Sequence, residues 1–260
     1  MKSFPFALIL CHLPLCGQSA TLLNETYDVG ASPNINDNFD DPNDTAWTQF
    51  GGGSIFLATP SGFTGNAMRN QSNSTPRGHT GSFSATTLSN VGDKLSLSLR
   101  FATANAPILP TVGNGYNIGL FNASDAGYFV RIGAQSARVE LLKDDGTGNP
   151  ADGGVTSLSL DTTAGASQFD SNVPKLITID LTRTASGLQI DTDIDGFTLS
   201  ATDTTAVQYD FSAVATTVGG GHSIDWFQDD IFVAFEPIPE PTGIVLLSIG
   251  FTGFFLRRRR

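Results

Sequence analysis

The chain has 260 residues, of which 40% are hydrophobic, and its 25 acidic residues outnumber its 14 Lys and Arg residues. Five of the basic residues lie at the two ends, so the body from Thr21 to Glu236 has nine basic against 24 acidic residues and a net charge of −15. A site for nucleic acid or an anionic membrane needs a positive patch, which argues against both as partners of the body. Metal cations and neutral glycans remain open as ligands, beside the simpler explanation that the acidic surface keeps an exported protein soluble.

Residues 1–20 have the pattern of a secretory signal peptide. Lys2 supplies the positive charge, an apolar stretch follows from Phe4 to Leu15, and small residues stand at Gly17, Ser19 and Ala20. Cleavage after Ser19 or after Ala20 satisfies the small-residue requirement. We therefore expect the chain to be exported and exclude this leader from the fold.

Both cysteines, Cys11 and Cys16, lie in the leader. A lipid on Cys16 would be an alternative anchor, but Pro14 and Leu15 stand where lipoprotein signals have small residues. The mature body thus has no disulfide and no thiol chemistry. Its core alone must hold it together, and about 200 residues suffice, since a chain of that size buries roughly 70% of its unfolded surface.

The body shows apolar residues with period two and no sustained period of 3.6. Residues 21–36 are expected to be a lead-in or an edge strand. Lys94 to Phe101 alternates cleanly, as a half-buried strand does. Further strands are predicted at 116–121, 128–132, 138–142, 158–160, 175–181, 188–194, 197–201 and 230–235. Short Gly-rich turns such as Ser186-Gly187 and Asp195-Gly196 connect them, which indicates an antiparallel sandwich or barrel.

The order of these elements resembles the concanavalin A/laminin-G-like jelly roll. The residues that carry the resemblance are Trp47, Gly119-Leu120-Phe121, Tyr128 to Ile132, the hairpin from Ile177 to Leu188 and the final strand Asp229 to Val233. The resemblance implies an all-β antiparallel β-sandwich over residues 37–236.

Catalytic residues are hard to find in this body. Laminarinase-like hydrolases of this fold have two glutamates flanking an aspartate on one strand, because retaining hydrolysis needs two carboxyls about 5 Å apart. Glu25, Glu140 and Glu236 are far apart in sequence. The pairs Asp144-Asp145 and Asp229-Asp230 consist of neighbours, which face opposite ways on a strand. We therefore expect no enzyme.

The histidines give no catalytic pattern either. His79 and His222 are expected at the surface, in loops rich in Gly, Ser and Thr. No nucleophile elbow accompanies them, and no partners for a two-histidine metal site stand out.

The sharpest acidic motif is Asp191-Thr-Asp193-Ile-Asp195-Gly196, which matches the opening of a calcium loop. The match fails at the twelfth position, where Thr202 stands in place of a bidentate Glu. Calcium at Asp191, Asp193 and Asp195 is therefore the weaker alternative to a strand with one wet face that enters an Asp-Gly turn. No other cofactor is expected.

A glycan site would combine aromatic rings with hydrogen-bonding side chains. Trp47 and Trp226 are the leading candidates, with Asp225 beside Trp226. Large aromatic side chains also fill the interior of a sandwich, and this is the more common role.

The last 22 residues consist of three blocks: Pro239, Glu240 and Pro241, then an uncharged run from Thr242 to Leu256, then Arg257, Arg258, Arg259 and Arg260. As a helix, residues 242–256 would rise about 22 Å, short of a hydrocarbon core of roughly 30 Å unless the arginines snorkel and the bilayer thins. Arginine-rich flanks stay cytoplasmic, so the body would lie outside. We expect a single short transmembrane helix that begins after a proline break.

This tail, over residues 237–260, resembles the PEP-CTERM sorting signal of bacteria. The resemblance implies a transient membrane anchor that an exosortase-type enzyme recognises and processes. It also implies an exported protein of the cell envelope or extracellular matrix, associated with exopolysaccharide or biofilm. An ordinary tail anchor with a basic stop would leave the Pro-Glu-Pro tripeptide unexplained.

The sequence therefore predicts a non-catalytic, exported protein that acts as a glycan-binding or structural sandwich. The alternative is a secreted polysaccharide-acting hydrolase with an unrecognised Asp-based site.

Overall fold

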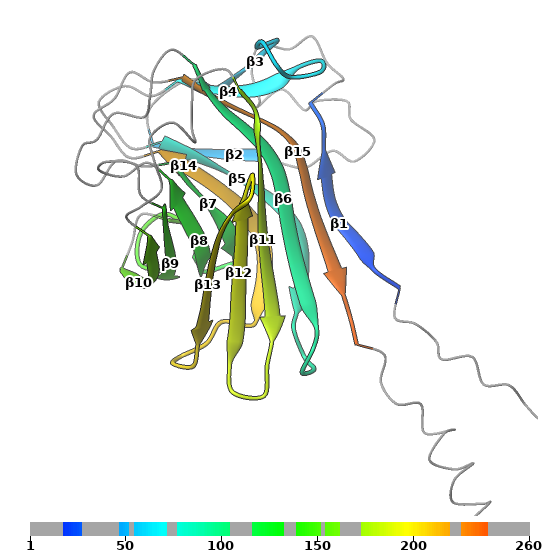
Figure 1. Ribbon diagram of the computed structural model, residues 1–260, viewed down its shortest axis with the longest axis vertical. Helices are drawn as coiled ribbons and strands as arrows, with labels where there is room; N and C mark the ends of the chain where they lie inside the picture. Colours follow the sequence, from blue (N-terminus) through cyan, green and yellow to red (C-terminus); the bar gives the residue numbers. More distant parts are fainter. Residues whose placement is uncertain are drawn as a thin grey trace, which may run out of the picture.

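The computed structural model describes residues 18–27, 47–51, 55–71, 77–104, 116–132, 139–151, 154–161, 173–218 and 225–238. These residues form fifteen strands in two layers and contain no helix (Figure 1). Accordingly, no helix within these ranges is long and apolar enough to cross a membrane. The predicted leader up to residue 17 and the predicted tail from residue 239 lie outside the described residues.

One layer is an eight-stranded antiparallel sheet. Its strand order is β13 (Phe197–Asp203), β12 (Leu188–Ile194), β11 (Lys175–Arg183), β6 (Lys94–Ala104), β15 (Asp225–Glu236), β4 (Ala67–Gln71) and β3 (Ile55–Ala58), with β1 (Ala20–Glu25) also paired to β15. β15 is long enough to pair with β4 along its first half and with β1 along its second.

The other layer is a seven-stranded antiparallel sheet. Its strand order is β10 (Val155–Asp161), β9 (Val139–Asp145), β8 (Ala126–Ile132), β7 (Tyr116–Phe121), β14 (Asp210–Val218), β5 (Arg77–Thr87) and β2 (Trp47–Gly51). Together the two sheets confirm the predicted all-β antiparallel sandwich.

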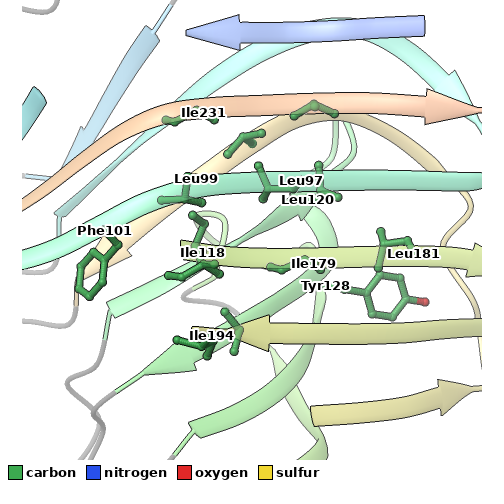
Figure 2. Packing of buried hydrophobic residues seen from close by; sticks show 14 of the residues in the cluster. Leu97, Leu99, Phe101, Ile118, Leu120, Tyr128, Ile179, Leu181, Ile194 and Ile231 are labelled. Atoms are coloured by element: carbon green, nitrogen blue, oxygen red, sulfur yellow. The ribbon is translucent and has the colours of Figure 1, made fainter. Parts of the chain in front are cut away.

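The core lies between the sheets and follows from the period-two pattern. On β6, Leu95, Leu97, Leu99 and Phe101 are all buried, while the residues between them face outward. Figure 2 shows Leu97 and Leu99 meeting side chains of the opposite sheet, among them Ile118 and Leu120. Each buried leucine is worth about 1.5–3 kcal/mol relative to an exposed one, so this alternation decides the face of the strand.

Five strands lie outside the predicted set: β2, β3, β4, β5 and β14. β5 reads Arg-Gly-His-Thr-Gly-Ser-Phe-Ser-Ala-Thr-Thr, with too few apolar residues for an alternating pattern. Their partners in the sheets bring these segments into strands. At the start of the segment predicted as a lead-in or an edge strand, Ala20 to Glu25 pair with β15 as β1. Cleavage after Ser19 would leave this strand whole.

The sandwich has two ends, and antiparallel pairing assigns the described turns to one or the other. The turns 88–93, 184–187 and 204–209 lie at one end, together with the start of β1 and the end of β15. We call this end the terminal pole. The other end, the distal pole, holds Val173 before β11 and the Asp195-Gly196 turn between β12 and β13.

Candidate functional site: the outer face of the eight-stranded sheet

The outward-facing side chains of β12 and β13 are polar throughout. On β12, Leu188, Ile190 and Ile194 are buried, and Gln189, Asp191 and Asp193 alternate with them. On β13, Thr198, Ser200 and Thr202 are exposed. Register places Asp191 opposite Ser200 and Gln189 opposite Thr202, so the polar side chains stand in rows across the sheet.

Four side chains of these rows are hydrogen-bonded to one another. Ser200 Oγ donates to Asp191 Oδ1 at 2.6 Å, and Gln189 Nε2 donates to the same oxygen at 3.0 Å and to Ser200 Oγ at 2.6 Å. Thr202 Oγ1 donates to Gln189 Oε1 at 2.6 Å. We call Gln189, Asp191, Ser200 and Thr202 the outer-face array. Its members hold one another in place, and each keeps further lone pairs or protons that face solvent.

Charged side chains lie beside the outer-face array, toward β6 and β15. Asp180 of β11 stands directly opposite Asp191, which places two carboxylates side by side on the surface. Lys94 lies 3.6 Å from Asp180 and 3.7 Å from Glu236 and offsets part of this charge. Like charges opposite one another in a sheet are unfavourable.

One aromatic ring lies on the same face. Phe232 of β15 is 37% exposed and shares a row with Ser98 of β6 and Thr178 of β11. On β15 it alternates with Ile231 and Val233, which are wholly buried. A β-bulge between Asp229 and Phe232, where Asp230 has φ 52°, sets this alternation. The face thus offers hydroxyl, amide, carboxylate and aromatic groups.

The three aspartates of the calcium hypothesis do not converge. Asp191 belongs to the outer-face array, Asp193 Oδ1 accepts from Gly196 N at 2.6 Å, and Asp195 Oδ2 lies 2.6 Å from Lys175 Nζ. Asp195 and Gly196 form the two-residue turn, with φ 52° and 92°, as the hairpin interpretation predicts. Within the described ranges, no group of three or more acidic, His or Cys side chains is placed to hold a metal ion.

Both tryptophans lie in the core. Trp47 is 7% exposed and Trp226 is 1% exposed, so neither ring has a face free for a sugar. Trp226 packs edge-on against Tyr116, and Trp47 packs edge-on against His79. Their large apolar surface favours this burial. The side chain of Asp225 lies outside the described residues, as do Pro239 to Pro241 and Arg257 to Arg260.

His79 is wholly buried, which corrects the expectation of a surface histidine. It lies on β5, beside Thr216 of β14, and its Nε2 is 2.8 Å from Gln228 Nε2. Tyr116 OH donates to Gln228 Oε1 at 2.9 Å. An amide NH2 only donates, so Nε2 accepts and the ring is neutral. Burial lowers the pKa of His79 to about 3. A sealed, neutral ring is no general base for an external substrate.

The adjacent aspartate pairs face opposite ways, as expected. Asp144 is buried and Asp145 is exposed; Asp229 is buried and Asp230 is exposed. Asp230 pairs with Arg100 at 3.1 Å. Neither pair offers two carboxyls on one accessible surface, which two-carboxylate hydrolysis requires.

The outer-face array was missed as a unit by sequence reasoning. The signal is present in part, since the sequence predicts a strand with one wet face that includes Asp191. Pairing with Ser200 and Thr202 depends on the β12–β13 register, which follows from the position of the Asp195-Gly196 turn.

No protein-family model matches the chain, and no curated protein matches its sequence. Among solved structures, the binding domain of botulinum neurotoxin serotype D is similar with a TM-score of 0.53 and 11% identity, over 89% of this chain and 52% of that one. The binding domain of Paraclostridial Mosquitocidal Protein 1 has a TM-score of 0.53 and 14% identity, over 87% and 51%. The chain thus spans about half the length of these relatives.

The exoplasmic/lumenal domain of VIP36, in a Ca²⁺/Man3GlcNAc-bound form, is similar over 75% of this chain and 85% of that one, with 12% identity. Its TM-score is 0.47. At these identities the likeness shows the fold alone. The fold is the antiparallel two-sheet β-sandwich that the order of strands in the sequence predicts.

Proposed function

We propose that this protein is a non-catalytic binding protein that holds a neutral glycan on the outer face of its eight-stranded sheet. The outer-face array carries the proposal. Gln189, Asp191, Ser200 and Thr202 present an ordered set of donors and acceptors, and Phe232 adds an exposed ring on the same face. Sugars are recognised by such hydrogen-bonding groups beside aromatic surfaces.

Charge narrows the class of glycan. The body has a net charge of −15, and Asp180, Asp191 and Asp193 all lie on this face. An anionic polysaccharide would be repelled, whereas the hydroxyl groups of a neutral one can donate to the carboxylates. The similar domain of botulinum neurotoxin serotype D is named a binding domain, which agrees with a binding role for this fold.

The chain ends support an exported location. The leader pattern of residues 1–20 supports export. The PEP-CTERM-like tail of residues 237–260 supports membrane insertion of residues 242–256 and processing by an exosortase-type enzyme. The body would then act in the cell envelope or extracellular matrix, where exopolysaccharide is the available partner.

Retention on immobilised polysaccharides tests the binding role. We expect the full chain to be retained on at least one neutral polysaccharide and not on anionic ones. Asp191→Ala removes the acceptor shared by Ser200 and Gln189 and should weaken retention by about 10- to 100-fold, because a hydrogen bond to a charged group is worth about 1.5–3 kcal/mol. Phe232→Ala should weaken it as well.

Val155→Ala is the matched control, since Val155 is 38% exposed on β10 of the other sheet. Equal retention of all three variants would place the site elsewhere. Release of reducing sugar that Asp191→Ala abolishes would contradict a non-catalytic role and favour the hydrolase alternative.

A further inference from the structure

The two ends of the described chain leave the sandwich side by side. Ala20 at the start of β1 is the register partner of Phe235 near the end of β15. Figure 1 shows β1 and β15 as neighbours, with the start of one beside the end of the other. The chain therefore enters the sandwich after the leader, and leaves it before the tail, at the same terminal pole.

The turn between β5 and β6 holds the chain at the point where the tail begins. Asp93 is 1% exposed, and its Oδ1 accepts from Ile238 N at 2.9 Å while its Oδ2 accepts from Asn90 N at 2.7 Å. The side chain of Ile238 packs on Gly92, where a Cβ would lie 2.6 Å from Ile238 Cγ1. We call Asp93, Gly92 and Ile238 the exit clamp.

The exit clamp is itself fastened to the rest of the eight-stranded sheet. Arg183 N donates to Asp93 O at 3.0 Å, and Gly92 N donates to Arg183 O at 2.8 Å. The guanidinium of Arg183 donates to Leu88 O at 2.6 Å and lies 4.5 Å from the ring centroid of Tyr209. Ile238 is thus bound to a rigid part of the body. A buried carboxylate with two backbone N–H donors is a strong anchor.

Little chain separates the exit clamp from the apolar run of the tail. Thr242 is four residues beyond Ile238, so its Cα lies at most about 14 Å away even when the chain is extended. β6 has 11 residues, which places the distal pole about 33 Å from the terminal pole at 3.3 Å per residue. An apolar run that enters a bilayer therefore brings the terminal pole to the headgroups and keeps the distal pole in water.

We propose that the terminal pole is a membrane-facing surface, that its partner is the lipid headgroup layer, and that Asp93 is the positioning residue that holds the body upright on it. The inference rests on the proposed membrane insertion of the tail. The acidic body has no electrostatic attraction to lipid, so the short, clamped connection alone sets the distance.

In this orientation the proposed glycan site stays accessible. With the strands standing along the membrane normal, the outer face of the eight-stranded sheet points sideways into the matrix, and lipid does not cover it. The leader also reaches this pole, because Leu15 lies only five residues before Ala20. Before leader cleavage, both apolar segments can occupy one membrane while the body is folded.

Single-cysteine labelling tests the orientation. The mature chain, residues 20–260, has no cysteine and lacks the apolar leader, so its binding to vesicles reports on the tail. A fluorophore at Ala185→Cys marks the terminal pole, and one at Val173→Cys, an exposed residue, marks the distal pole. The probe is a phosphatidylcholine vesicle with nitroxide quencher on its headgroups. We expect strong quenching at position 185 and little at position 173.

Two further variants test the exit clamp. Asp93→Asn replaces one acceptor by an NH2 that faces a backbone N–H, so it should reduce the difference in quenching between the two labels and speed amide exchange at Ile238. Eight Gly and Ser residues inserted after Ile238 leave the body intact and add roughly 16 Å of flexible tether, so they should abolish the difference. Asp210→Asn, an exposed substitution at the same pole, should change nothing.

The outcomes separate the two proposals. Vesicle-bound protein with equal quenching at both positions would overturn the upright orientation and leave the membrane tail standing. Vesicle binding with the expected difference, unchanged in Asp93→Asn and in the linker variant, would overturn the role of the exit clamp. Protein that does not float with vesicles would overturn the membrane tail, and the orientation with it.

Discussion

At the scale of single residues, the most unusual group is a neutral histidine inside the sandwich. His79 is fully buried beside Thr216 and Gln228, and its Trp47 neighbour packs edge-on at a centroid distance of 5.3 Å. A charged ring here would place two N–H donors, its own and that of Gln228, face to face. Protonation is therefore strongly disfavoured at this position in the folded protein.

The predicted consequence is a loss of stability in mild acid. Burial lowers the folded-state pKa of His79 to about 3, whereas the unfolded value is near 6.5. Below pH 6.5 the unfolded chain binds a proton that the folded chain does not, so the free energy of unfolding falls as the pH decreases toward 3. We expect this group to contribute a decrease of about 2 kcal/mol between pH 7 and pH 5.

Urea unfolding at the two pH values measures the effect. His79→Gln keeps a side-chain amide near the position of Nε2 and has no titratable group, so its stability should change less over this range. Identical decreases in the wild type and in His79→Gln would show that other groups cause the pH dependence.

At the scale of elements, an ion pair between Lys143 and Asp203 joins the two sheets. Lys143 of β9 donates to Asp203 Oδ2 of β13 at 2.7 Å, and Tyr128 OH of β8 donates to the same oxygen at 2.7 Å. Lys143 also donates to Ala206 O at 2.8 Å. Burial alone would raise the pKa of Asp203, but the hydrogen bonds from Lys143, Thr205 and Tyr128 outweigh it and lower the pKa. The pair closes the sandwich at the terminal pole.

Removal of one partner of this buried ion pair should lower the free energy of unfolding more than removal of one partner of an exposed pair. Lys143→Met leaves Asp203, with 5% of its side chain exposed, without its cation; we expect a loss of about 3 kcal/mol in the free energy of unfolding at pH 7. Arg100→Met breaks the Arg100–Asp230 pair, whose side chains are 51% and 50% exposed, and should cost under about 1 kcal/mol.

The pH dependence of the Lys143 effect is a second check. The folded-state pKa of Asp203 is depressed, so its contribution is fully present above the unfolded pKa of about 3.9 and is lost as the pH falls below it. The difference between wild type and Lys143→Met should therefore shrink in acid. Equal costs for Lys143→Met and Arg100→Met at pH 7 would refute the structural role of the pair.

At the scale of the whole molecule, the body and the proposed anchor are separable. The described strands all end before residue 237, and Ile238 makes the last described contact with the body. A chain that ends at Ile238 keeps the exit clamp and loses residues 239–260. We expect it to fold and to appear in the soluble fraction, whereas the full chain fractionates with membranes.

Arg257→Ser, Arg258→Ser, Arg259→Ser and Arg260→Ser in one chain should weaken retention without abolishing it, because the apolar run stays and the basic stop is lost. Fractionation and circular dichroism of both variants measure location and folding. A chain ending at Ile238 that still fractionates with membranes would point to a lipid on Cys16.

The sequence by itself determined the class of the fold, since alternation on β6, β11 and β12 places leucines and isoleucines on one side whatever the partners are. It also determined the β12–β13 turn, because Asp195-Gly196 tolerates positive φ at both positions. The leader and tail patterns are equally local, and what they predict for export and sorting stays a prediction.

Only the tertiary structure decided which weakly patterned segments become strands and which polar groups meet. β5 has few apolar residues and β14 lacks a strict alternation, and both are strands because neighbours on both sides pair with their backbones. His79 is buried, and Asp93 reaches Ile238 across 145 positions of sequence, through the same long-range pairing. The physical reason is that a period-two pattern reports only which face of a strand is apolar. Register and sheet order depend on contacts between residues far apart in the chain.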